Sequence, residues 1–228
     1  MSQTLMLTGD VNLMNVADPS VPFKLVAPIF AKSDFVFSNL ECCFYIPPGG
    51  HSLENEGFFA EAHAAEALKI AGIQAVGIAN NVNYGEAAIT RSIARLDEVG
   101  IPHTGAGANR DAARAPVILE KNGVKIGFLQ YTARWYQDRD MIATATEAGV
   151  AKIASIDGIT IDAGDLGRLK ADLKKLRPLV DVIVVSHHNR DGATPVQFNG
   201  KQTAAGKDRA KSEEYQRQFA HAALFRLG

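Results

Sequence analysis

Short apolar runs alternate with segments of helical period along this chain of 228 residues. Four runs have the length and composition of strands: 5–8, 35–41, 73–80 and 180–188. The last of these runs is the most convincing buried strand of the chain. Four segments space their apolar residues as amphipathic helices do: 21–33, 61–72, 85–100 and 162–178. This alternation predicts an α/β protein, a layered fold with a mixed, mainly parallel sheet flanked by helices.

Three further segments refine that outline. The two apolar stretches within 115–132 flank Asn122-Gly123, the dipeptide that type I′ turns favour, which predicts a β-hairpin. Residues 101–107 read as a short strand leading into a turn, and 212–223 as a helix, whereas 135–154 fits no single period. The helix predicted at 162–178 has a basic outer face and ends at Pro178.

With 46% hydrophobic and 21% charged residues, the composition suits one ordinary globular domain or two small ones, and we expect a single domain over residues 1–228. The 24 basic and 25 acidic residues nearly cancel, so total charge indicates neither a nucleic-acid partner nor an anionic membrane surface. No signal peptide or apolar run long enough for a membrane span is visible, so we expect a cytoplasmic protein. Cys42 and Cys43 are adjacent, too close for an ordinary disulfide, and read as small buried residues.

Polar side chains follow four of the predicted strands, where each strand ends. They are Asp10, Asn39, Glu41, Asn80, Asn81, His187 and His188. Parallel strands bring their carboxyl ends to one edge of a sheet, so these side chains are expected to converge there. Such a mixed oxygen and nitrogen set is typical of hydrolytic sites for divalent zinc, manganese or iron, in which the metal clamps a phosphate or activates water.

Each of these residues also has a structural interpretation. Asp10 follows a glycine and suits a turn or a helix cap, and Asn80 and Asn81 suit an Asx-turn and cap before the helix at 85–100. Glu41 and Asn39 could be solvated at a strand end. Two imidazoles at a strand exit have no obvious packing role, so His187 and His188 are the hardest to explain without a function.

The motifs LTGDVNLMN, DFVFSNLE, AVGIANN, GIPHTGAGAN and VIVVSHH, in this order, resemble the bacterial capsule synthesis protein CapA family, also called the poly-γ-glutamate capsule biosynthesis family. That resemblance implies a fold similar to calcineurin-like metallophosphoesterases. It implies Asp10 as a metal ligand and Glu41, with Asn39, as part of an acidic metal-binding element. It also implies Asn80 or Asn81 as an amide bridging metal and phosphate, and His187 or His188 as a metal or substrate ligand.

The chain departs from the family pattern in two places. Val82 stands where the family has a histidine suited to be the general acid, so Tyr84 or another histidine would have to supply that proton. The family's C-terminal strands and histidine-containing loop are also not found. We therefore expect a C-terminally incomplete domain, or one completed by an oligomer or another partner.

Two classes of function follow. The first is a metal-dependent hydrolase of phosphoester type, linked by resemblance to capsular poly-γ-glutamate, that acts on an anionic small molecule or polymer through Asn81, His187 and His188. The second is a non-catalytic family member that binds metal weakly or binds a partner. Two irregular segments could add substrate contacts or could be plain surface loops. They are 42–60, with His51, Glu54 and Glu56, and 189–208, with Arg190 and Lys201.

Overall fold

The computed structural model describes residues 2–48, 58–82, 85–133, 142–155, 159–189, 197–198, 201–202 and 209–223. The predictions for His51, Glu54, Glu56, Tyr84 and Arg190, and for the side chain of Lys201, lie outside the described residues. Among the helices of these ranges, none combines the length and the hydropathy that crossing a membrane requires.

The first sheet is parallel and has the order β1-β2-β3-β4. Its strands are β1 (Leu5–Val11), β2 (Phe35–Leu40), β3 (Ala75–Gly77) and β4 (His103–Thr104). The helices of this half are α1 (Ala27–Phe30), α2 (Glu66–Ala71), which follows the 3-10 turn η1 (Ala62–Ala65), and α3 (Glu86–Val99). α2 and α3 end at Gly72 and Gly100, as the sequence predicted.

The second sheet has the order β6-β7-β9. β6 (Val117–Lys121) is antiparallel to β7 (Val124–Thr132), and β7 is parallel to β9 (Val182–His188). The helices of this half are α5 (Ala163–Leu176), with the 3-10 turn η2 (Arg177–Leu179), and α6 (Arg209–Ala223). The short elements are α4 (Arg110–Ala113), the pair β5 (Ala106–Gly107) and β8 (Gly149–Val150), and the pair β10 (Gln197–Phe198) and β11 (Lys201–Gln202).

The predicted hairpin is confirmed. β6 and β7 pair up to Lys121 and Val124, and the two residues between them, Asn122 and Gly123, have φ angles of 54° and 79°. Positive φ at both central residues is the conformation of a type I′ turn, which an Asn-Gly dipeptide adopts with little strain.

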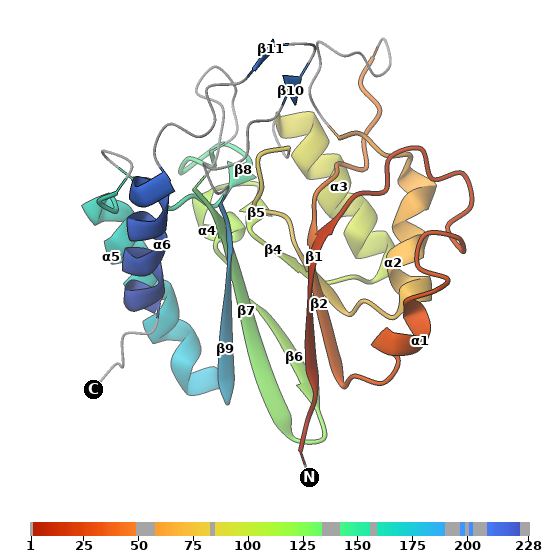
Figure 1. The fold of residues 1–228 in the computed structure, drawn as a ribbon, viewed down its shortest axis with the longest axis horizontal. Helices are drawn as coiled ribbons and strands as arrows, with labels where there is room; N and C mark the ends of the chain where they lie inside the picture. The colour runs from red at the N-terminus through yellow and green to blue at the C-terminus, as the bar shows by residue number, and fades with distance from the viewer. Residues whose placement is uncertain are drawn as a thin grey trace.

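The two sheets face each other across an aromatic core. Phe37 of β2 stacks on Phe128 of β7, with ring centroids 4.7 Å apart, and Val117, Ile126 and Ala75 pack around the pair. α2 and α3 cover the outer face of the first sheet, while α5 and α6 cover the outer face of the second (Figure 1). The α/β prediction is therefore confirmed, with the strands divided between two facing sheets.

Two local predictions were wrong. The helix expected over 21–33 is reduced to α1, because Pro28 has no N–H to donate and is tolerated only in the first helical turn. The strand expected to be buried at 180–188 is only partly covered, with Val182 44% exposed. Within the described residues β9 pairs with β7 alone, so it is an edge strand there.

The N-terminus of α5 offers a test of the local structure. The Asp162 carboxylate accepts a hydrogen bond of 2.9 Å from the backbone N–H of Asp165. Asp162→Ala should lower the free energy of unfolding by about 1 kcal/mol, because the cap satisfies an N–H that the helix leaves unpaired. Urea unfolding measures this loss. Asp162→Asn keeps an accepting oxygen and should be nearly neutral, and an equal loss in both variants would contradict a capping role.

Candidate metal centre

Three strands of the two sheets end beside one another with ligand-type side chains. Asp10 on β1, Glu41 just after β2 and His188 at the end of β9 each offer one ligand atom, and these atoms lie within 4.8 Å of one another. The strands run upward in Figure 1, so their carboxyl ends meet at its upper side. Residues far apart in sequence thus form one cluster, as expected when parallel strands bring their carboxyl ends to one edge.

A bulge in β1 sets the position of Asp10. Leu7 pairs with Phe37, but Asp10 rather than Gly9 pairs with Asn39, so β1 carries one extra residue at this point. An extra residue reverses the face toward which the following side chain points, and bulges near functional sites commonly aim a side chain in this way. Asp10 thereby shares a face with Asn39, whose Nδ2 donates to Asp10 Oδ1 at 2.6 Å.

The His188 imidazole lies among oxygen atoms on both of its edges. Its Nε2 is 2.8 Å from Asn81 Oδ1 and 3.6 Å from Glu41 Oε1. Its Nδ1 is 3.9 Å from Asp10 Oδ1 and 3.3 Å from Asn39 Nδ2. The ring is therefore at the centre of the cluster, and contacts to both of its nitrogen atoms hold it there.

Asn39 positions its neighbours. Its Oδ1 accepts from Gln130 Nε2 at 2.9 Å and lies 3.4 Å from Asn80 Nδ2, so its Nδ2 is the atom that faces Asp10. An amide nitrogen cannot ligate a metal, and the amide oxygen of Asn39 faces Gln130 and Asn80 rather than the cluster. In this arrangement Asn39 orients Asp10, which differs from the direct ligand role that the sequence predicted.

Gln130 is the residue of this site that sequence reasoning missed. It is 1% exposed, its Oε1 accepts from the backbone N–H of Ala79 at 2.7 Å, and its Nε2 also reaches Ser186 Oγ at 3.2 Å. Its amide fills the space over Gly77, where a Cβ would lie 2.3 Å from Gln130 Cδ. The signal in the sequence is a glutamine that directly follows the apolar run 126–129 of strand β7.

The two adjacent asparagines have different roles. Asn80 is fully buried, donates to the Leu40 carbonyl at 2.7 Å and accepts from the Val82 N–H at 3.2 Å, which makes it an Asx-turn residue that ties β2 to the loop after β3. Asn81 directs its Oδ1 at His188. The structure therefore brings Asn81 to the cluster and gives Asn80 the structural role that the sequence had left open.

His187 points to the opposite face of the second sheet, because successive side chains of a strand alternate. Its ring stacks on Phe219 of α6 with centroids 3.9 Å apart, and its Nε2 is 3.5 Å from the Tyr215 hydroxyl. Burial, with the neighbouring His188, lowers the pKa of His187 to about 3. The sequence grouped the two histidines, but the structure brings only His188 to the cluster.

The residue directly after the two asparagines, Val82, is apolar. Val82 is buried, and its carbonyl oxygen accepts a hydrogen bond of 3.2 Å from Cys43 Sγ. Cys42 and Cys43 are buried and form no disulfide within the described residues, and burial raises the pKa of Cys42 to about 12, so Cys42 is a neutral core residue. The described part of the loop after β3 supplies no side chain that could protonate a leaving group.

The donor set suits a divalent metal. Two carboxylates and an imidazole, with the Asn81 amide oxygen beside them, form the mixed oxygen and nitrogen set that zinc, manganese and iron accept. Asn39, itself held by Gln130, orients Asp10 through a hydrogen bond, as outer residues commonly do around metal ligands. These four residues, Asp10, Glu41, Asn81 and His188, are therefore the candidate ligands.

Fold and site together define a two-sheet α/β protein with a candidate metal centre at the carboxyl edge of its parallel strands. Residues 4–224 match the model of the family described as bacterial capsule synthesis protein PGA_cap, so the chain belongs to that family. No curated protein matches the sequence significantly.

Solved structures with a similar arrangement share little sequence with this chain. NAD nucleotidase of Haemophilus influenzae is 9% identical with a TM-score of 0.45, and the match covers 82% of this chain but only 34% of that protein. A phosphatase of Mycoplasma pneumoniae is 12% identical with a TM-score of 0.41, covering 88% and 69% of the two chains. A hypothetical protein of Thermus thermophilus is 14% identical with a TM-score of 0.43, covering 96% and 84%.

Proposed function

We propose that this chain is a divalent-metal-dependent hydrolase of phosphoesters that serves capsule synthesis. The observation that carries the proposal is the convergence of Asp10, Glu41 and His188 from three separate strands, with ligand atoms within 4.8 Å of one another. Membership of the capsule synthesis family agrees with it. The substrate would be an anionic small molecule or polymer.

Asp10, Glu41, His188 and Asn81 would hold the ion. A bound zinc, manganese or iron would polarise a phosphoryl oxygen and lower the pKa of a coordinated water. Asp10 is 54% exposed at its side chain, so the cluster is open to an incoming ligand on that side. His188 and Glu41 are more enclosed, at 12% and 17%, which keeps their positions defined.

Metal removal tests the proposal. Protein purified without chelator should contain about one or two equivalents of zinc, manganese or iron and should turn over a generic phosphodiester or phosphomonoester. Dialysis against EDTA should abolish that turnover, and re-addition of the ion should restore it. Circular dichroism before and after dialysis checks that the fold is retained. Folded protein with neither bound metal nor turnover after metal addition would overturn the proposal.

Val82 supports a second candidate, a non-catalytic family member that binds metal or a partner. It is buried and apolar at the position where the family resemblance implies a general acid. Val82→His is the discriminating variant: a gain in turnover with unchanged metal content would show that the natural chain binds metal without efficient catalysis. Full turnover in the natural chain would exclude this candidate.

A further inference from the structure

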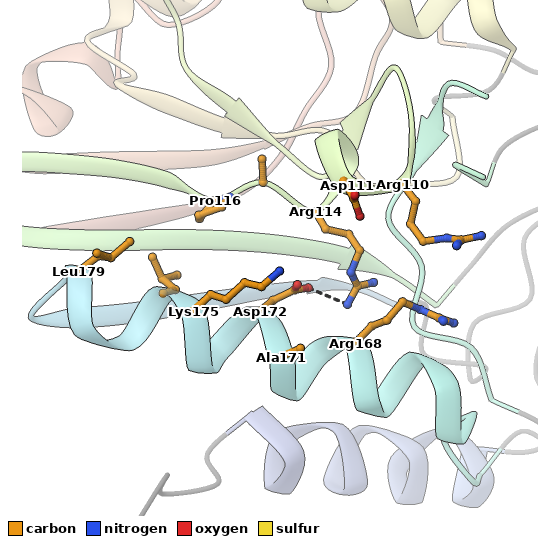
Figure 2. Close-up of a pocket in the computed structure, with 11 residues that line it drawn as sticks. Arg110, Asp111, Arg114, Pro116, Arg168, Ala171, Asp172, Lys175 and Leu179 are labelled. Carbon is orange, nitrogen blue, oxygen red and sulfur yellow. Dashed lines mark ion pairs between the residues drawn. The ribbon is translucent and has the colours of Figure 1, made fainter. Parts of the chain in front are cut away.

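A second site candidate lies away from the metal cluster, between α4 and α5. A cavity of about 460 Å³ opens there (Figure 2). Four basic side chains line it, Arg110, Arg114, Arg168 and Lys175, against two acidic ones, Asp111 and Asp172. The cavity is therefore cationic in a chain whose total charge is near zero.

This cavity and the metal cluster are on opposite faces of the second sheet. Tyr131 of β7 is in register with His187 of β9, and its hydroxyl donates to Asp172 of α5 at 2.8 Å. Gln130, the preceding residue, points to the other face and contacts Asn39. The sheet thus separates the two sites, and a ligand in the cavity would not touch the candidate metal ligands.

Arg114 anchors the cavity. It is 7% exposed, its Nη2 is 2.7 Å from Asp172 Oδ2, and its guanidinium lies 4.8 Å from the centroid of the Tyr131 ring. Among the described residues its Nε has no hydrogen-bond partner. A buried guanidinium that is held rigidly yet incompletely satisfied is suited to binding an anion.

Of the other three cations, two are less engaged. Arg168 pairs with Asp165 at 2.5 Å, whereas Arg110 and Lys175 form no ion pair within the part of the chain that the structure describes. A smaller cavity of about 250 Å³ is lined by the same three arginines, Arg110, Arg114 and Arg168. The three arginines therefore line both cavities.

The lining changes character along the larger cavity. In Figure 2 Arg110, Arg114 and Arg168 gather at one end, while Leu179 and Pro116 lie toward the other. A mostly apolar wall with a few convergent charged groups is typical of sites for small organic molecules, and the volume lies in the range of such sites.

We propose that this cavity binds a small organic anion, a phosphate or carboxylate group carried on an apolar body. The oxyanion would lie against Arg110, Arg114 and Lys175, because guanidinium and ammonium groups give charge-assisted hydrogen bonds to oxyanions. The apolar body would cover Pro116 and Leu179. The site is independent of the proposed hydrolysis and stands whether or not the metal centre is catalytic.

Calorimetric titration of the full chain tests the site, after metal has been removed with EDTA and the EDTA has been dialysed away, since phosphate then cannot bind through a metal. Phenyl phosphate and benzoate serve as probes, and the tighter of the two identifies the preferred oxyanion. Lys175→Gln and Arg110→Gln should each raise the Kd of that probe about tenfold, because one charge-assisted contact is lost. Both residues are exposed, so neither change should affect folding.

Lys174→Gln is the matched control, since Lys174 neighbours Lys175 on α5, is exposed and does not line the cavity. Its Kd should equal that of the natural chain. An equal loss of affinity in Lys174→Gln would show a diffuse charge effect and would overturn the proposal. So would failure of both probes to bind.

Discussion

His188→Ala should abolish stoichiometric metal binding and, with it, any phosphoester turnover. The imidazole lies between the Asp10 and Glu41 carboxylates, with its two nitrogens 3.9 Å and 3.6 Å from their oxygens. Loss of an outer hydrogen-bond partner typically weakens metal binding 10- to 100-fold, so loss of a central ligand should exceed about 100-fold. Metal content after dialysis and turnover with added metal measure the effect.

His187→Ala is the matched control, the same change one residue earlier in the same strand. It should retain metal binding within about twofold and instead lower the free energy of unfolding by about 1–2 kcal/mol, through loss of the stacking on Phe219. Equal loss of metal in the two variants would contradict the division of roles between the histidines. Retained metal in His188→Ala would remove that residue from the site.

The sequence could predict that polar residues converge, because the carboxyl ends of parallel strands share an edge. Asp10, Glu41, Asn81 and His188 come together as that rule requires. The sequence could not show that His188 rather than His187, and Asn81 rather than Asn80, belongs to the cluster. Each choice depends on the direction in which a side chain points. For the histidines this direction is set by the register of β9 on β7, and for the asparagines by the Asx-turn at Asn80; the apolar periodicity of the sequence shows neither.

The division into two sheets and the cavity between α4 and α5 could not be predicted from the sequence, for a related reason. Apolar periodicity shows which face of a strand is covered, but not which strand is its neighbour, so the division into two facing sheets was not predictable. The cavity between α4 and α5 joins arginines of one segment to the basic face of a helix far along the chain. The sequence indicated that basic face but not what lies opposite to it.

Gln130 links the two sheets and should influence the metal centre from outside it, through Asn39. Gln130→Ala would leave the Ala79 N–H and Asn39 Oδ1 without their present partner, at a cost of about 1–3 kcal/mol for each buried group. Asn39 could then rotate, and Asp10 would lose its orienting hydrogen bond of 2.6 Å. We expect metal affinity to fall 10- to 100-fold.

A purely structural role would lower stability without changing metal affinity in the folded protein, so both quantities must be measured, by urea unfolding and by metal titration. Gln74→Ala is a suitable control, because Gln74 Oε1 accepts from the Val36 N–H at 2.9 Å, near the opposite end of β2 from Glu41. It should lower stability and leave metal affinity unchanged. If Gln130→Ala also lowers stability and leaves metal affinity unchanged, Asn39 keeps its orientation without Gln130. That result would contradict the proposal that Gln130 orients Asp10 through its hydrogen bond to Asn39.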